Sequence, residues 1–233
     1  MSSSQSRPTL RVDWCSYEAA KYAVEHWHYS RSMPAGKMAR LGAWEDGVYI
    51  GAVLFSRGAS NAIGSPYGLT QTEVAELTRV ALRDHRTSVS RIIAVAMRML
   101  RRQSPGLRLI VSYADPAHGH SGGIYQAGNW LFVGDSKPDF AIVDASGKRW
   151  HSRMVSSNGV KVSFGCARKV IRPDEGTRVE LPGKHKYLYP LDDAMRKQIE
   201  PLRKPYPKRA DEATKDATGD QPGKGGANPT RPL

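Results

Sequence analysis

The sequence predicts an α/β fold: a central mixed β-sheet with helices on both faces. Strand-like alternation and helical periodicity follow one another along residues 9–191. A strand–helix–strand passage over residues 76–113 implies parallel neighbours in the middle of the sheet. Asp46 and Gly47, set between two apolar runs, indicate a hairpin and therefore an antiparallel edge.

Each element has its own signal. Apolar runs and alternation predict strands over residues 9–14, 39–44, 48–55, 76–82, 107–113, 130–134 and 184–191, with a further hairpin over 140–155. Helical spacing predicts a helix over residues 18–27 behind Ser16 and a short helix over 122–129. The longest helix begins near Ser88, gathers its apolar residues on one face, and ends before Pro105.

Composition divides the chain into one folded domain, residues 1–202, and a disordered basic tail, residues 203–233. The tail is rich in proline and glycine and has Tyr206 as its only aromatic residue, so it cannot bury enough apolar surface to fold. The whole chain carries a formal charge of +13, whereas the tail has seven Lys and Arg against four Asp and Glu. The folded part is therefore basic itself, which favours a polyanionic partner such as DNA, RNA or a phosphate-rich cofactor.

Targeting signals and cysteine usage point to a cytoplasmic protein with no membrane partner. The longest apolar runs are strand-sized, and the first eight residues lack the apolar core of a signal peptide. Cys15 and Cys166 are too few for a disulfide scaffold and are not clustered as zinc ligands are.

The order of the elements resembles the acyltransferase fold of the Gcn5-related N-acetyltransferases. This resemblance implies that the donor's pyrophosphate binds at the N-terminus of the longest helix, where backbone N–H groups and the helix dipole attract anions. Arg86, Thr87, Ser88 and Ser90 are the expected cofactor-binding residues there. The loop over residues 83–91 has no glycine, however, so an ordinary serine-capped basic helix is the open alternative.

Several long motifs resemble the Mom family of bacteriophage DNA-modification proteins. They are HWHYSR at 26–31, PAGK at 34–37, ELTRVAL at 76–82, SYADPAHGHSGGIYQAGNW at 112–130 and YLYPL at 187–191. The resemblance implies an enzyme that converts adenine in DNA to a carbamoylmethyl-type derivative at its exocyclic amine, which protects phage DNA from host restriction. It implies double-stranded DNA with a flipped adenine as one partner, and acetyl-CoA or another acyl donor as the second.

The implied chemistry requires a base and a pocket. Adenine's exocyclic amine is a poor nucleophile, and one of its protons must leave during or after attack. Within a duplex the adenine must also flip out and stack on an aromatic or apolar wall. His28 is the candidate base and Tyr29 its stacking or hydrogen-bonding partner; the alternative is that both side chains only pack the end of the first helix.

Further candidates follow the central strand over residues 107–113. Ser112 and Asp115 lie at its carboxyl end, where open α/β sheets bind ligands. Ser112 could stabilise developing charge or position the amine, and Asp115 could orient His28 or accept the proton. An Asx turn is the alternative for Asp115. The resemblance to the acetyltransferases, in which a tyrosine on this helix often lies near the donor, implies that place for Tyr125, and Asp139 is a further catalytic candidate.

His118 and His120, together with Asp115, have the donor types of a non-haem iron site. Because all three lie on one loop whose directions nothing in the sequence sets, we expect a substrate-binding or solvated loop and no metal. The candidates for phosphate contact are Arg98, Arg101, Arg102, Lys148, Arg149, Arg153, Lys161, Arg168 and Lys169.

Two rival functions stay open at this point. An acetyl-CoA-dependent N-acyltransferase acting on a protein or a small amine would bind coenzyme A tightly and would not depend on DNA. A DNA-binding protein without catalysis would lose only stability when His28 or Ser112 is replaced by alanine.

Overall fold

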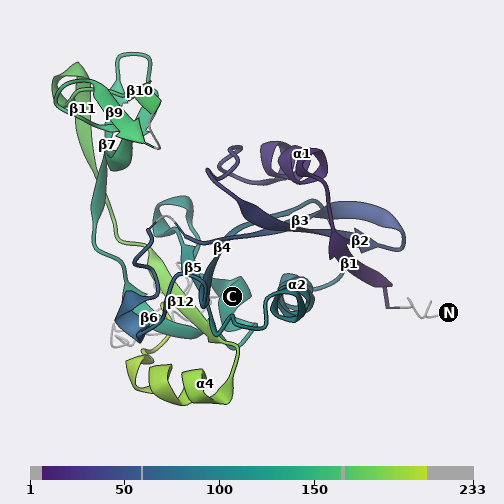
Figure 1. Ribbon diagram of the computed structural model, residues 1–233. Coiled ribbons are helices and arrows are strands. Elements are labelled where there is room, and N and C mark those ends of the chain that lie inside the picture. Colours follow the sequence, from purple (N-terminus) through teal and green to yellow (C-terminus); the bar gives the residue numbers. More distant parts are fainter. Residues whose placement is uncertain (1–6, 59, 164–165, 209–233) are drawn as a thin grey trace, which may run out of the picture.

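The computed structural model describes residues 7–58, 60–163 and 166–208. These residues form a large β-sheet with helices on both faces and a smaller lobe of short strands, which projects from the large sheet (Figure 1). The mixed α/β sheet expected from the sequence is therefore confirmed.

The strands of the large sheet are β1 (Leu10–Trp14), β2 (Met38–Glu45), β3 (Val48–Ser56), β4 (Val74–Leu82), β5 (Leu109–Ala114), β6 (Leu131–Asp135) and β12 (His185–Pro190). The lobe contains β7 (Asp139–Asp144), β8 (Arg149–His151), β9 (Val160–Ser163), β10 (Cys166–Lys169) and β11 (Gly176–Leu181). The helices are α1 (Tyr17–Trp27), α2 (Val89–Gln103), α3 (Gly123–Gln126) and α4 (Asp193–Ile199). Within the described ranges, no helix is both long and apolar enough to cross a bilayer.

The large sheet has the strand order β1-β2-β3-β4-β5-β12-β6. Only the neighbours β4 and β5 run parallel, and α2 connects them, as the strand–helix–strand passage predicts. The hairpin between β2 and β3 is also confirmed: Asp46 and Gly47 have φ values of 50° and 82°, as a two-residue type I′ turn requires. Strand β12 lies between β5 and β6 and pairs antiparallel with both.

Two faces of the sheet carry separate cores. Successive residues of a strand point to opposite faces, so Ile110 of β5 packs in the core that contains α2, whereas Leu109 and Val111 pack in the core that contains α4. Helix α1 packs on β3 through Ala52 and Leu54. Figure 1 shows α1 and α2 on opposite sides of the β2–β3 region. Helices on both faces are thus confirmed.

Strands β4 and β5 separate at a defined point. Their pairing ends with Leu77 opposite Ser112, and the register between β3 and β4 shifts at the same place, which leaves Thr78 as a bulge. The Ser112 hydroxyl is 2.8 Å from the carbonyl oxygen of Leu77 and 2.8 Å from the hydroxyl of Tyr125. Because a hydroxyl has one proton, Ser112 donates to the carbonyl and accepts from Tyr125. This chain ties both strands to α3 where they part.

Four elements escaped the sequence-based prediction: α4, β9, β10 and β11. Helix α4 buries only Met195 and Ile199, too few residues for a visible period, although Asp192 caps it by accepting from the Met195 N–H at 2.7 Å. Strands β9 and β10 have four residues each and their described side chains are all exposed, so neither presents a run long enough to signal a strand.

The domain extends beyond the expected boundary at residue 202. The Lys204 N–H donates to the carbonyl of Phe132 at 2.8 Å, and the Tyr206 hydroxyl donates to the carbonyl of Trp130 at 2.7 Å. Composition placed these residues in the tail, but two hydrogen bonds hold them beside β6. Residues 209–233 of the expected tail lie outside the described ranges.

Replacing Ser112 by alanine should lower the free energy of unfolding by about 1–3 kcal/mol, because the buried Tyr125 hydroxyl and the Leu77 carbonyl both lose a partner. Urea titration measures the change. Ser65→Ala is the control, since Ser65 is exposed and makes no side-chain hydrogen bond within the described residues; it should change stability by less than about 0.5 kcal/mol. Equal effects of the two variants would contradict the role of Ser112.

Candidate functional site

Three histidines surround one tyrosine beyond the end of β5. The ring centroid of Tyr29 lies 4.3 Å from that of His28, 4.7 Å from that of His118 and 5.1 Å from that of His120. His28 and Tyr29 follow α1, whereas His118 and His120 follow β5. We call these four residues the His–Tyr cluster. Tyr29 is 50% exposed, so the cluster is open to solvent.

The surroundings of His28 determine where its proton lies. Its Nδ1 accepts from the backbone N–H of Ser30 at 3.1 Å and lies 2.8 Å from the Ser30 hydroxyl. A backbone N–H can only donate, so the proton of the neutral ring is on Nε2. Burial, followed by the charges of Arg79 and His120, lowers the pKa of His28 to about 4. At neutral pH His28 is an uncharged ring with an N–H donor at Nε2.

Arg79 connects the His28 loop to the bulge in β4. Its Nε donates to the carbonyl of Ser32 at 3.3 Å, and its Nη1 donates to the carbonyl of Thr78 at 2.7 Å. It is a half-buried positive charge beside the cluster that sequence reasoning did not select. A possible signal was present, since an arginine inside an apolar strand needs a special reason.

Asp115 is shared between a turn and the cluster. One carboxylate oxygen accepts from the Ala117 N–H at 3.1 Å, which is the Asx turn that the sequence left open. The other lies 3.0 Å from Lys184 Nζ and 3.4 Å from His118 Nδ1. Burial alone would raise the pKa of Asp115, but Lys184 outweighs it and the pKa is lowered. The ionised carboxylate therefore favours a proton on Nδ1 of His118 and leaves the lone pair at Nε2.

Asp139 lies at the root of the lobe. Its carboxylate is 3.3 Å from Nε2 of His151, on β8 of the same lobe. Within the described residues, the contacts of the Asp139 carboxylate are with Phe140, His151 and Ser152, and none is with the His–Tyr cluster. Lys184, which pairs with Asp115, also lowers the pKa of His151 through its positive charge. The connection between Asp139 and Asp115 is therefore electrostatic and runs through His151 and Lys184. Sequence reasoning did not single out Lys184 or His151.

Ser112 and Tyr125 lie in the interior rather than at the cluster. Ser112 is 0% exposed and Tyr125 is buried. Burial raises the pKa of Tyr125 to about 12, so it keeps its proton and donates to Ser112. Because both side chains are buried, their placement does not support a role for Ser112 on the amine or a position for Tyr125 beside the donor. Both residues hold the split strands together instead.

The N-terminus of α2 already holds an anion from the protein itself. Glu45, buried at the end of β2, accepts from the backbone N–H groups of Arg86 and Thr87, each at 2.8 Å, and from the Thr87 hydroxyl at 2.6 Å. The Arg86 side chain pairs with Asp46. The Arg86 and Thr87 donors expected to bind a pyrophosphate are thus occupied by carboxylates of the protein, so these two residues do not fit that role.

The two serines of the expected phosphate loop add little to it. Ser88 is the N-cap of α2 but its side chain makes no capping hydrogen bond. The Ser90 hydroxyl is 3.5 Å from that of Ser88. Ser88 therefore occupies the N-cap position that the alternative interpretation expects, but its side chain does not cap the helix. The backbone N–H groups just before α2 are instead bound by Glu45.

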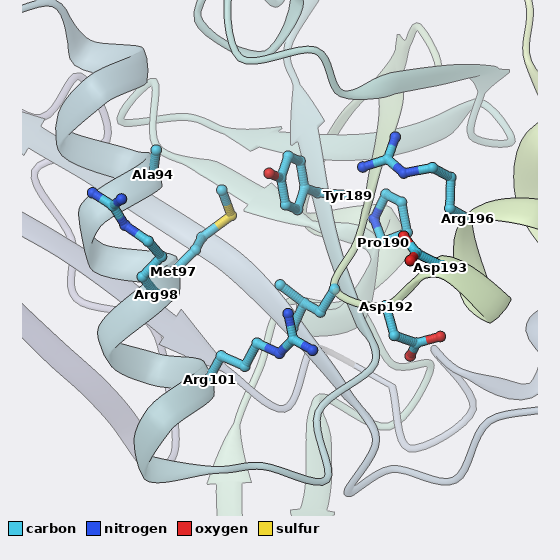
Figure 2. Close-up of a pocket in the computed structure, with 10 residues that line it drawn as sticks. Ala94, Met97, Arg98, Arg101, Tyr189, Pro190, Asp192, Asp193 and Arg196 are labelled. Carbon is cyan, nitrogen blue, oxygen red and sulfur yellow. The ribbon is translucent and has the colours of Figure 1, made fainter.

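A cavity of about 250 Å³ lies far from the cluster. Figure 2 shows side chains of α2 on one side of it and side chains from β12 and α4 on the other. Its lining residues are Ala94, Met97, Arg98, Arg101, Tyr189, Pro190, Leu191, Asp192, Asp193 and Arg196. Pro190 pairs with Leu109 and His185 with Ala114, so the length of β5 separates this cavity from Asp115.

Metal ligands do not gather in the part of the chain that the structure describes: no three His, Cys, Asp or Glu residues there are placed to hold an ion. His118, His120 and Asp115 are close in sequence, but the contact to Asp115 is made by His118, at 3.4 Å, whereas the His120 ring packs at a tilt against Tyr29.

The model of the Mom protein family matches residues 9–208. The chain is 26% identical over 206 residues to the methylcarbamoylase mom of Escherichia phage Mu, which covers 85% of this chain and 84% of that protein.

Two solved structures are also similar. An N-acyl amino acid synthase from uncultured soil microbes has a TM-score of 0.45 at 10% identity, covering 82% of this chain and 94% of its own. An IAA acetyltransferase from Bacillus cereus has a TM-score of 0.42 at 9% identity, covering 78% and 100%.

Replacing Glu45 by glutamine should destabilise the protein in a pH-dependent way. Hydrogen bonds from Thr87 come first, then those from Arg86, and they outweigh burial to hold the pKa of Glu45 below its ordinary value of 4.5. A lowered folded-state pKa stabilises the fold above the unfolded-state value, and this stabilisation is lost as the pH falls. The difference in unfolding free energy between wild type and Glu45→Gln should therefore be largest near about pH 7 and shrink below about pH 4.

Urea titration across this pH range measures the effect of Glu45→Gln. Glu180→Gln is the control, because Glu180 is exposed and forms a surface pair with Arg178 that contributes about 0–1 kcal/mol. A constant difference between wild type and Glu45→Gln at all pH values would show that the charge of Glu45 is not what holds the loop.

Proposed function

Because the chain belongs to the Mom protein family, we propose that it modifies DNA, converting adenine at its exocyclic amine to a carbamoylmethyl-type derivative. In this proposal the product protects phage DNA from host restriction, and the reaction takes place in the cytoplasm of the host. The substrates are double-stranded DNA with a flipped adenine and a donor of the transferred group.

The His–Tyr cluster is the observation that supports this function. A flipped adenine needs an aromatic wall and polar groups at its edge. Tyr29 offers a half-exposed ring, and three imidazoles stand around it. Stacking of one base on such a ring contributes about 1–3 kcal/mol. The charge of +13 supplies attraction to the phosphates, so affinity should fall steeply with salt.

We assign His28 the role of hydrogen-bond donor rather than the role of base that its sequence context favours. Its Nδ1 is already an acceptor for the Ser30 N–H, so its outward nitrogen carries a proton. A neutral imidazole can donate a hydrogen bond to a carbonyl oxygen. His28 would therefore hold the carbonyl oxygen of the carbamoylmethyl group and orient the neighbouring methylene carbon for attack by the adenine nitrogen.

We assign His118 the role of base. Asp115 faces its Nδ1 at 3.4 Å, which leaves Nε2 free to accept a proton. In the reaction, the adenine nitrogen forms a bond to the donor's electrophilic carbon, and the donor's leaving group departs with the bonding electrons. The amine proton passes to His118. Lys184, 3.0 Å from Asp115, keeps the carboxylate ionised.

The donor in this proposal carries the transferred group on a leaving group, and its methylene carbon is the electrophile, because attack on an acyl carbonyl carbon would give an amide instead of the carbamoylmethyl linkage. Acetyl-CoA was the first expectation, but Glu45 occupies the backbone N–H groups of Arg86 and Thr87 that would bind its pyrophosphate. We therefore assign no step to coenzyme A and place no donor phosphate at α2.

The direct test is mass analysis of nucleosides from DNA made in cells that express the protein. We expect a deoxyadenosine derivative heavier than deoxyadenosine, absent from cells with an empty vector. Soluble, folded protein that yields only unmodified deoxyadenosine would contradict the proposed function. Transfer to proteins or small amines without DNA would favour the rival N-acyltransferase.

Glutamine substitutions distinguish a donor from a base. Glutamine can donate a hydrogen bond but cannot accept a proton as a base does. His28→Gln should keep activity within about 10-fold of wild type, whereas His28→Ala should lose about 10²–10³-fold. His118→Gln should lose about 10²–10⁴-fold. His26→Gln is the control, since His26 stacks on Tyr22 outside the cluster. A loss of activity in His28→Gln as large as that in His28→Ala would contradict the donor role of His28.

The pH–rate profile gives an independent test of the same assignment. Because the pKa of His28 is lowered to about 4, His28 stays neutral above about pH 5. The acid limb of the kcat/KM profile should therefore persist in His28→Gln at the wild-type position. Disappearance of that limb in His28→Gln would mean that His28 is the titrating base.

A further inference from the structure

Strands β9 and β10 form a two-stranded ribbon in the projecting lobe (Figure 1). The ribbon residues with described side chains are all exposed: Val160, Lys161, Val162, Cys166, Ala167, Arg168 and Lys169. A two-stranded ribbon with both faces in solvent is at best marginally stable by itself. Because both faces are exposed, the side chains of the ribbon are available to bind a partner.

The two faces of the ribbon differ in chemistry. The register pairs Lys161 with Arg168 on one face, and Val162 with Ala167 on the other. Val162 is 72% exposed, a large value for an apolar side chain. One face of the ribbon is therefore cationic and the other is largely apolar.

On the cationic face, two positive charges, those of Lys161 and Arg168, lie directly opposite one another. Like charges directly opposite one another on neighbouring strands destabilise the pair. Residues 160–169 contain no Asp or Glu to offset the repulsion. The Lys161 ammonium donates to the Arg153 carbonyl at 2.7 Å, and Arg168 has no ion pair within the described residues. An anion bound from outside would relieve this repulsion, so the face suits a phosphate-bearing partner.

The root of the lobe is joined to the candidate active site. Asp139 begins β7 and contacts His151 of β8, while Lys184, just before β12, contacts Asp115 beside the His–Tyr cluster. Strands β7 and β11 pair through six residues, from Gly176 opposite Asp144 to Leu181 opposite Asp139. A long molecule that reaches the cluster can therefore also be held by the ribbon.

We propose that the β9–β10 ribbon enters the major groove of the DNA duplex that carries the target adenine. This inference rests on the proposed function, which makes DNA the substrate. The major groove is about 12 Å wide and admits a two-stranded β-ribbon. Lys161 and Arg168 contact phosphates, and Val162 contacts the apolar part of the groove, such as thymine methyl groups.

Salt-dependent binding tests the ribbon. The double variant Lys161→Gln/Arg168→Gln is compared with Arg91→Gln/Lys197→Gln, which removes the same charge from exposed positions of α2 and α4. Fluorescence anisotropy measures binding to an unmodified duplex of about 25 base pairs over a range of salt concentrations. Loss of two phosphate contacts should reduce the slope of log K against log salt by about 2 and weaken binding at least about 10-fold at low salt.

Two further measurements sharpen the test. Val162→Ser should weaken binding without changing the salt slope, since no phosphate contact is lost. Duplex RNA of equal length should compete poorly, because its major groove is too deep and narrow for a ribbon. Equal salt slopes for the ribbon variant and the α2–α4 control would overturn the inference, as would equal competition by RNA. Thermal melting of each variant excludes unfolding as the cause.

Different results would contradict the ribbon inference and the proposed function. If wild-type protein modifies adenine and the ribbon variant binds and modifies DNA as well as wild type does, only the ribbon inference is overturned. If wild-type protein yields no modified adenine, the proposed function fails whatever the ribbon does. With both correct, the ribbon variant should show a raised KM for DNA and a kcat close to wild type.

Discussion

The hydrogen bond from Ser112 to the Leu77 carbonyl marks the point on which the candidate site depends. Up to this pair β4 and β5 run parallel, and beyond it they part. The divergence leaves β4 to carry Arg79 toward the end of α1, while the chain after β5 turns at Asp115 to place His118 against Tyr29. Tyr125 completes the buried chain, so a change in this interior would be felt at the surface cluster.

His28 and His118 differ in which ring nitrogen carries the proton, because their neighbours differ. The backbone N–H of Ser30 makes Nδ1 of His28 an acceptor, whereas the carboxylate of Asp115 favours a proton on Nδ1 of His118. The outward nitrogens are therefore a donor and an acceptor. In the proposed reaction, His28 is the donor that orients the transferred group and His118 is the acceptor of the amine proton.

The α2 N-terminus shows how a fold and its ligand sites can separate. The strand–helix–strand unit that commonly receives phosphate is present, but Glu45 supplies the negative charge from within. The carboxylate stabilises the loop without any ligand. The phosphate contacts that we propose lie elsewhere, on the lobe formed by the chain between β6 and β12.

The sequence alone determined the order of the strands of the large sheet with α1, α2 and α3, the Asp46–Gly47 hairpin, the basic folded part, and the motif residues His28, Tyr29 and Asp115. These features depend on local periodicity, turn chemistry and composition. The tertiary structure decided that β12 separates β5 from β6, that Ser112 is sealed inside, that Glu45 meets Thr87, and that His118 meets Tyr29. Periodicity shows which face of an element is apolar, but it contains no information on which distant element packs there; Ser112 and Leu77 are 35 residues apart, and Glu45 and Thr87 are 42.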